Sequence, residues 1–156
     1  MAVLRATVPT DLSGIHALIG GIYADYGFAM DFAGCERHLV EPGPYARATG
    51  GEFWVVEDQG TVRGTVGVLL HGDAGELKSL YVHRTLRRHG WGRTLVTKVI
   101  DYTEAAGKPR TILWSDTRFL DAHRLYESMG FARRGMRELH DLYDSKEILF
   151  ERPFAP

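Results

Sequence analysis

The first fifty residues combine a strand pattern with helix patterns. Residues 3–8 are β-prone and end at Pro9. Asp11 offers a helix start, and the apolar residues behind it keep helical spacing: Ile15, Leu18, Ile19, Ile22 and Tyr23. A second, weaker helix is predicted over residues 31–40, ended by a loop of proline and glycine at 41–44.

The middle of the chain predicts an antiparallel meander. Residues 53–56, 62–70 and 76–82 are β-prone runs, separated by short turns. In the third run, Leu77 and Leu80 are out of step for strict alternation. A β-bulge between them would bring both to the core, although a strand buried on both faces fits the same pattern.

Beyond the meander the pattern changes to helix, strand and helix. Residues 92–106 and 119–129 each carry an apolar helical stripe, with a strand predicted at 111–114. Strand, helix and strand of this length predict a parallel crossover. A final strand is predicted at 147–150, with 132–138 as its neighbour. The chain therefore predicts a single mixed α/β domain over residues 1–156.

Composition and charge narrow the classes of function. Hydrophobic residues make up 44% and charged residues 25%, and the net charge of -1 favours neither nucleic acid nor membrane as a partner. Seven scattered histidines and one cysteine predict no metal site, and Cys35 is expected to be a buried thiol. Neither a signal peptide nor an apolar run of ~20 residues is visible, so the expected localisation is cytoplasmic.

One loop carries a chemical signal. It joins the third β-prone run to the next helix and reads Leu80-Tyr81-Val82-His83-Arg84-Thr85-Leu86-Arg87-Arg88-His89-Gly90-Trp91-Gly92-Arg93. Amides at a helix start lack internal partners and the helix dipole favours anions there, so a pyrophosphate is the natural ligand. A dinucleotide fingerprint and a P-loop are both absent. Taken by itself, the loop also fits a pair of glycines that cap the helix within a basic segment, with no ligand bound.

Two motifs together resemble the GNAT family of N-acetyltransferases. Arg87-x-x-Gly90-x-Gly92 resembles its coenzyme A pyrophosphate loop, [Arg/Gln]-x-x-Gly-x-[Gly/Ala]. Ala122-x-x-Leu125-Tyr126-x-x-x-Gly130-Phe131 resembles its C-terminal motif. Phe119 stands where the family often has asparagine. The resemblance implies a GNAT fold, an α/β (α+β) architecture with a mixed central sheet of about six or seven strands, antiparallel at first and parallel at the C-terminal crossover, and about four helices.

The resemblance also implies a cofactor, acetyl-CoA. The loop amides from 88 to 93 would hold the pyrophosphate, and the backbone of residues 80–82 would pair with the pantetheine arm and polarise the thioester carbonyl. The implied cofactor-binding residues are Leu80, Tyr81, Val82, Arg87, Arg88, His89, Gly90, Trp91, Gly92 and Arg93.

Two residues are candidates for catalysis. Tyr126 occupies the motif position from which the family tyrosine serves as general acid, and a phenol can protonate a departing thiolate. Glu76 stands eleven residues before Arg87, as the basic glutamate does in the histone-acetylating members. The alternative for Tyr126 is a core aromatic without a catalytic role, and the alternative for Glu76 is a solvent-facing residue at a strand end. Asp116 and His83 are rival candidates for the general base.

The acceptor is expected between the first two helices. Tyr23, Tyr26 and Phe28, with Asp116, are the predicted substrate-binding residues, and aromatic rings with acids suit a cationic amine. An ordinary amphipathic loop fits these residues too. The predicted function is acetyl transfer from acetyl-CoA to a primary amine of an unidentified small molecule or peptide. A non-catalytic acyl-CoA sensor and a phosphate-binding regulatory domain are the alternatives, and a homodimer is left open.

Overall fold

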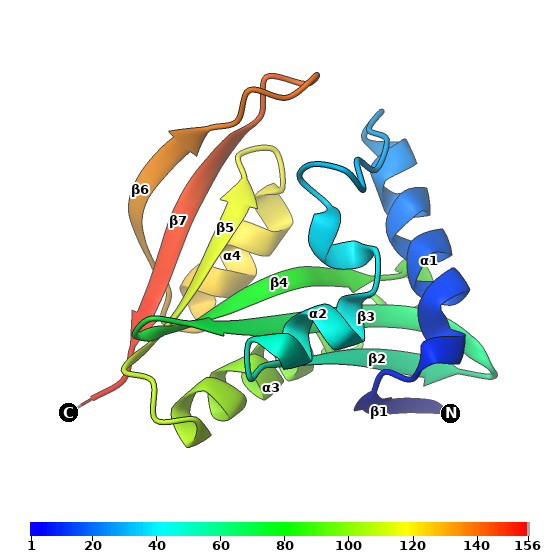
Figure 1. Cartoon of the computed structure of the whole chain (residues 1–156), viewed down its shortest axis with the longest axis horizontal. Coiled ribbons are helices and arrows are strands. Elements are labelled where there is room, and N and C mark those ends of the chain that lie inside the picture. The colour runs from blue at the N-terminus through cyan, green and yellow to red at the C-terminus, as the bar shows by residue number, and fades with distance from the viewer. Residues whose placement is uncertain (156) are drawn as a thin grey trace.

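Seven strands form one sheet in the order β1-β2-β3-β4-β5-β7-β6 in the computed structural model, which describes residues 1–155 (Figure 1). The strands are β1 (Ala2–Ala6), β2 (Glu52–Asp58), β3 (Thr61–His71), β4 (Ala74–Val82), β5 (Arg110–Asp116), β6 (Ala132–Glu138) and β7 (Lys146–Pro153). The α-helices are α1 (Leu12–Asp25), α2 (Pro42–Ala48), α3 (Trp91–Ala105) and α4 (Leu120–Ser128). Short 3-10 helices are η1 (Pro9–Asp11), η2 (Arg37–Leu39) and η3 (Arg84–Leu86).

The alternation of side chains along β2 explains why both faces of the sheet are covered. Phe53 and Val55 lie in one core with the apolar residues of α1 and α2. Trp54 and Val56 point the other way, into a larger core with α3 and α4. Figure 1 shows α2 crossing in front of β2 and β3.

A β-bulge in β4 confirms one of the two interpretations of this strand. The register with β3 shifts at Ser79, whose φ is +56°, and Thr65 Oγ1 donates to the Ser79 carbonyl at 2.8 Å. Leu77 is buried and Leu80 packs against the same core. The extra residue therefore brings both leucines to one face.

The pairing between β4 and β5 ends early. These parallel strands pair only from Ala74↔Arg110 to Glu76↔Ile112. β7 pairs with the other edge of β5 along its whole length, from Arg110 to Asp116, so β5 stays with β7 as it separates from β4. Residues 77–82 therefore have a strand neighbour on one side only among the described residues.

The prediction of a helix over 31–40 followed by a loop at 41–44 is wrong. Residues 32–36 form turns, and α2 begins at Pro42. A proline in the first helical turn costs no hydrogen bond, because the backbone N–H that it lacks would have no intrahelical partner there. Cys35, in the irregular segment, is exposed rather than buried. The other predicted helices and strands have counterparts within a few residues.

No helix within residues 1–155 combines the length and the apolar character that a bilayer crossing needs.

Candidate active site

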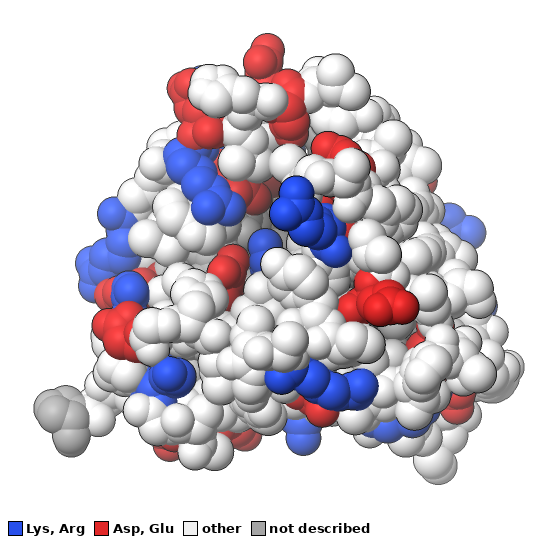
Figure 2. Space-filling view, in the orientation of Figure 1, with Lys and Arg blue, Asp and Glu red and all other residues white. Residues whose placement is uncertain are grey.

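A cleft of about 1190 Å³ opens where β4 and β5 separate. Its walls come from the segment after α1, from β4, from the loop before α3, from the end of β5, from α4 and from the β6–β7 connection. Figure 2 shows this face hollowed near its centre, with acidic and basic side chains around the hollow.

The loop before α3 presents consecutive free amides at this cleft. Arg88 and Gly90 have left-handed backbones, with φ of +67° and +79°, and α3 begins at Trp91. Within residues 1–155, none of the backbone amides from 88 to 93 donates a hydrogen bond. Free amides at a helix start, with left-handed residues before it, form a concave anion site.

Nine of the ten predicted cofactor-binding residues line the cleft, and His89 is the one described member that does not. The Arg87 guanidinium folds back, and its Nε donates to the Val82 carbonyl at 3.2 Å. Arg93 donates to Ser128 Oγ at 3.0 Å. The loop is thereby tied both to the free edge of β4 and to α4.

Tyr126 lies in the core and also lines the cleft. Its ring packs against Phe131 and Phe150, with centroids 5.9 and 5.6 Å away, and the residue is 5% exposed. Its hydroxyl makes no hydrogen bond within the part of the chain that is described. Burial raises the pKa of the phenol, so it stays protonated as a potential proton donor.

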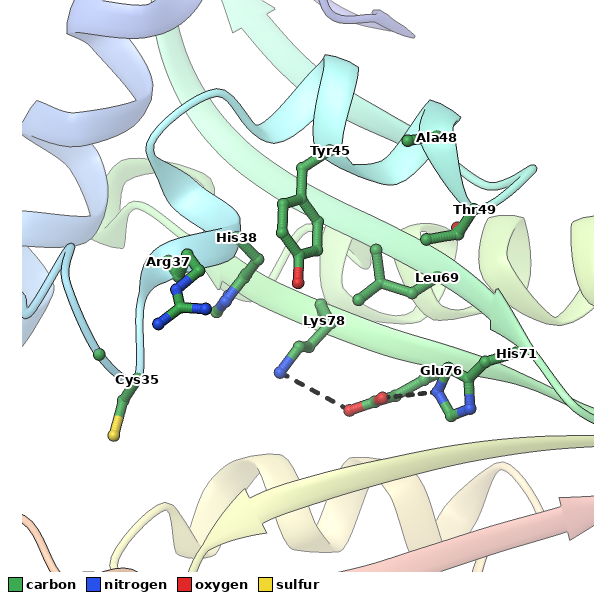
Figure 3. Close-up of a pocket in the computed structure, with 11 residues that line it drawn as sticks. Cys35, Arg37, His38, Tyr45, Ala48, Thr49, Leu69, His71, Glu76 and Lys78 are labelled. Carbon is green, nitrogen blue, oxygen red and sulfur yellow. Dashed lines mark hydrogen bonds and ion pairs between the residues drawn. The ribbon is translucent and has the colours of Figure 1, made fainter.

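Glu76 lies elsewhere, in a side pocket of about 580 Å³ on β3, β4 and α2 (Figure 3). Its carboxylate is 2.8 Å from His71 Nε2 and 3.6 Å from Lys78 Nζ. Lys78 and His38 line both the side pocket and the cleft, so the two spaces adjoin. The structure therefore does not bring Glu76 and Tyr126 into one cavity.

The predicted acceptor aromatics line the cleft and pack against its far wall. Tyr26 contacts Phe119 and Phe28 contacts Tyr143, each pair with ring centroids 4.8 Å apart. Tyr23 accepts a hydrogen bond from the Tyr81 hydroxyl at 3.1 Å. These contacts connect the segment after α1 to the start of α4 and the β6–β7 connection.

Asp116 also lines the cleft, but a neighbouring cation already balances its charge. Arg118 makes two hydrogen bonds to the Asp116 carboxylate, each 2.7 Å long. The same guanidinium lies over the Phe28 ring, 4.5 Å from its centroid. Asp116 is therefore engaged before any acceptor arrives.

Sequence reasoning missed several polar residues at the cleft or directly behind it, including Lys78, Glu36, Ser115 and His123. Glu36 lines it and is half-buried, and burial raises its pKa. It lies in irregular chain, where no periodic pattern marks it. Ser115 lines the cleft at the end of β5, and His123 lies behind it on α4. His123 could have been found from the sequence, because it is a polar residue on the apolar stripe of α4.

No group of three or more histidine, cysteine, aspartate or glutamate side chains within residues 1–155 is arranged to hold a metal ion.

Comparisons with known proteins agree with this architecture. The model of the acetyltransferase (GNAT) family matches residues 20–131. The chain therefore belongs to the GNAT acetyltransferase family. An acetyltransferase from Streptococcus agalactiae has the same fold, with a TM-score of 0.85 over 98% of both chains at 19% identity. A Salmonella typhimurium protein solved with acetyl-CoA as its cofactor gives a TM-score of 0.75 over 97% of this chain and 93% of that one, at 18% identity.

Relatives with more similar sequences are named as N-acetyltransferases or as a synthetase of an N-acetylated product. An uncharacterised N-acetyltransferase of Schizosaccharomyces pombe is 30% identical over 134 residues, 84% of this chain and 82% of the relative. The N-acetylaspartate synthetase of Danio rerio is 31% identical over 134 residues, 85% of this chain. The match spans only 45% of that relative's length.

Proposed function

We propose that this protein transfers an acetyl group from acetyl-CoA to a primary amine by direct attack. The observation that carries the proposal is the row of free amides from 88 to 93, in a cleft that the free edge of β4 also lines. Free amides at a helix start suit a pyrophosphate. A free strand edge suits an extended, amide-containing arm.

In this proposal the pyrophosphate of the cofactor lies on the loop and its pantetheine arm pairs with residues 80–82. A backbone N–H within residues 80–82, directly after the bulge at Ser79, polarises the thioester carbonyl. The amine attacks the carbonyl carbon, and the carbon–sulfur bond then breaks with its electron pair on sulfur. The resulting thiolate takes a proton from the Tyr126 hydroxyl, which lines the same cleft.

A carboxylate accepts the proton that the amine loses. Glu76 is the candidate from the sequence, and it would act through water because it lies in the side pocket. Glu36 is a second candidate, because it lines the cleft itself.

We further propose that the acceptor carries a carboxylate beside its amine. Arg37 and Lys78 both line the side pocket (Figure 3). Arg37 makes no ion pair within residues 1–155, and the one acidic partner of Lys78 there is Glu76, at 3.6 Å. Two cations against one carboxylate favour an anionic group in this space. The name of the zebrafish relative, whose product is acetylated aspartate, agrees with such an acceptor.

The test is release of free coenzyme A thiol from acetyl-CoA with matched amines. Each pair differs in one carboxylate: glycine with methylamine, L-phenylalanine with phenethylamine, and L-aspartate with β-alanine. We expect the member with the additional α-carboxylate to turn over at least ten-fold faster in at least one pair, which corresponds to about 1.4 kcal/mol. Lys78→Met should remove that preference without changing the affinity for acetyl-CoA.

The outcomes separate the parts of the proposal. Transfer to amines with no preference for the members that carry the α-carboxylate would contradict the acceptor class alone. Saturable acetyl-CoA binding without transfer to any amine would instead favour a sensor of acyl-CoA.

A further inference from the structure

Ser115 and His123 form a buried pair at the level where the acyl group would lie. Ser115 stands three residues beyond Ile112 on β5, and Ser79, the bulged residue, stands three beyond Glu76 on β4. Because Glu76↔Ile112 is the last pair, Ser115 and Ser79 lie on opposite sides of the opening between the strands. Both residues line the cleft.

The ring of His123 has a defined hydrogen-bonding state. Its Nε2 is 2.9 Å from the Asp116 carbonyl oxygen and 3.1 Å from Ser115 Oγ. A carbonyl oxygen only accepts, so Nε2 carries the hydrogen. Nδ1 is buried and has no partner among the described residues. His123 is 2% exposed, and burial lowers its pKa. The ring is therefore neutral, with Nε2 as donor.

This state fixes the role of the Ser115 hydroxyl. The single hydrogen on Nε2 is shared between the Asp116 carbonyl oxygen and Ser115 Oγ. Because Nε2 is a donor, Ser115 cannot donate to it, so the hydroxyl hydrogen of Ser115 is not used in that contact. Ser115 makes no other side-chain hydrogen bond within residues 1–155. Ser115 and Leu113 point to the same face of β5, and Leu113 lies in the core that contains Tyr126. Ser115 and Tyr126 both line the cleft, so the unused hydroxyl hydrogen is available to a ligand there.

We propose that the Ser115 hydroxyl donates a hydrogen bond to the thioester sulfur as the acyl group leaves, and that His123 is the positioning residue that holds it. The inference rests on the proposed acetyl transfer. As the carbon–sulfur bond breaks, its electron pair stays on sulfur, and Ser115 stabilises that charge without giving up its proton. The proton that finally resides on the thiol still comes from Tyr126. A donor whose orientation is fixed in advance stabilises developing charge without reorganisation.

The experiment compares Ser115→Ala, His123→Leu and the double variant, using the fastest acceptor of the matched amine panel. We expect each single variant to lower kcat about ten-fold, as for a lost hydrogen bond. The KM for acetyl-CoA should not change, because the hydrogen bond forms only as charge develops. The double variant should be no slower than the slower single variant, since both remove one interaction.

Several results would overturn the inference: a kcat for Ser115→Ala within two-fold of wild type, losses that multiply in the double variant, or a raised KM with unchanged kcat. If His123→Leu is unfolded, His123→Gln replaces it, because glutamine keeps an N–H donor. Turnover should then stay near that of the wild type, and a loss as large as that of Ser115→Ala contradicts the positioning role. A wild-type protein that acetylates no amine refutes the proposed function itself, whereas an active wild type with an equally active Ser115→Ala refutes only this inference.

Discussion

Glu76 and Ile112 form the last pair between the parallel strands β4 and β5. The cleft opens where the two strands separate beyond this pair. β4 bulges at Ser79, while β5 stays beside β7. The free edge of β4 and the free amides at the start of α3 line one cavity. The proposed cofactor site is therefore largely a property of the backbone.

Replacement of Gly90 tests the pyrophosphate loop. Gly90 and Gly107 have nearly equal φ, +79° and +77°, and a Cβ at either would meet no atom within 4 Å. Gly90→Leu and Gly107→Leu should therefore lose similar stability, about 1–2 kcal/mol for the left-handed backbone. Only Gly90→Leu places a side chain where the pyrophosphate approaches. Its Kd for coenzyme A should rise at least ten-fold in calorimetry, about 1.4 kcal/mol. Equal affinities in the two variants would argue against the loop.

Tyr126→Phe separates activity from stability. Removing the hydroxyl should lower turnover by about 10²-fold, the lower end of the range for general acid catalysis. The melting temperature should not fall, because that hydroxyl has no hydrogen-bond partner within residues 1–155. Tyr102→Phe is the control. The Tyr102 hydroxyl donates to the Gly50 carbonyl at 2.7 Å, so its loss should cost about 1 kcal/mol of stability and leave turnover unchanged. A Tyr126→Phe enzyme of wild-type rate would make this residue structural.

The pH profile distinguishes the two candidate bases. Burial raises the pKa of Glu36, against opposing contributions from Asp31 N–H and the Tyr23 hydroxyl, while Asp31 and Asp141 raise it further. A raised carboxyl pKa means that the charged, basic form appears at a higher pH than for an exposed glutamate. If Glu36 is the base, the acidic limb of the rate profile lies above the ordinary glutamate range. Glu36→Gln then removes that limb.

If Glu76 is the base, Glu76→Gln flattens the rise of rate with pH, and Glu36→Gln leaves the profile unchanged. The loss of rate in Glu76→Gln should be smaller for amines of low pKa, because these amines are already neutral. If both variants keep the wild-type dependence of rate on pH, neither glutamate is the base. Acetyl transfer would then depend on the proximity of the reactants and on the backbone N–H at the thioester carbonyl.

Acid stability depends on Asp11 at the start of α1. Arg5 makes two hydrogen bonds of 2.8 Å to this buried carboxylate and Val8 N–H a third, and the pKa of Asp11 falls from 3.8 to about 2. A lowered folded-state pKa stabilises the fold above pH 4, and this contribution is lost as the pH falls through about 2. Asp11→Asn should therefore cost about 2 kcal/mol at pH 7. The difference between wild type and Asp11→Asn in the free energy of unfolding, measured in urea, should become smaller from pH 4 to pH 2.

Glu57→Gln is the matched control for Asp11→Asn. Glu57 also pairs with Arg5, at 3.0 Å, but its side chain is 40% exposed. An exposed pair contributes little, so this variant should lose less than about 1 kcal/mol. Equal losses in the two variants would contradict the role of burial at Asp11.

The sequence predicted the parts of the fold that depend on local pattern. The apolar stripes of α1, α3 and α4 and the β-prone runs of the meander are periodic, so their positions could be read directly. The start of α2 at Pro42 could not, because the same prolines that begin a helix also occur in loops. The bulge was one of two readings of Leu77 and Leu80, and only the register with β3 decided between them.

The candidate site was predictable where a motif carries it. The loop from Arg87 to Arg93 and the motif around Tyr126 were recognisable in sequence. The ion pairs of Glu76 with His71 and Lys78 depend on tertiary contacts, and so does the bidentate hold of Arg118 on Asp116. No residue spacing along the chain predicts these ion pairs.

The most direct test of the central claim is an NMR titration of the ¹⁵N-labelled protein with acetyl-CoA. The account predicts saturable binding of one molecule, with the largest shifts at the backbone amides of residues 80–82 and 88–93. The amides of β1 and of the α3 C-terminus around Gly107, away from the cleft, should not move. Saturable binding with the largest shifts elsewhere, or no binding at millimolar acetyl-CoA, would contradict the claim that the opening between β4 and β5 holds the acyl donor.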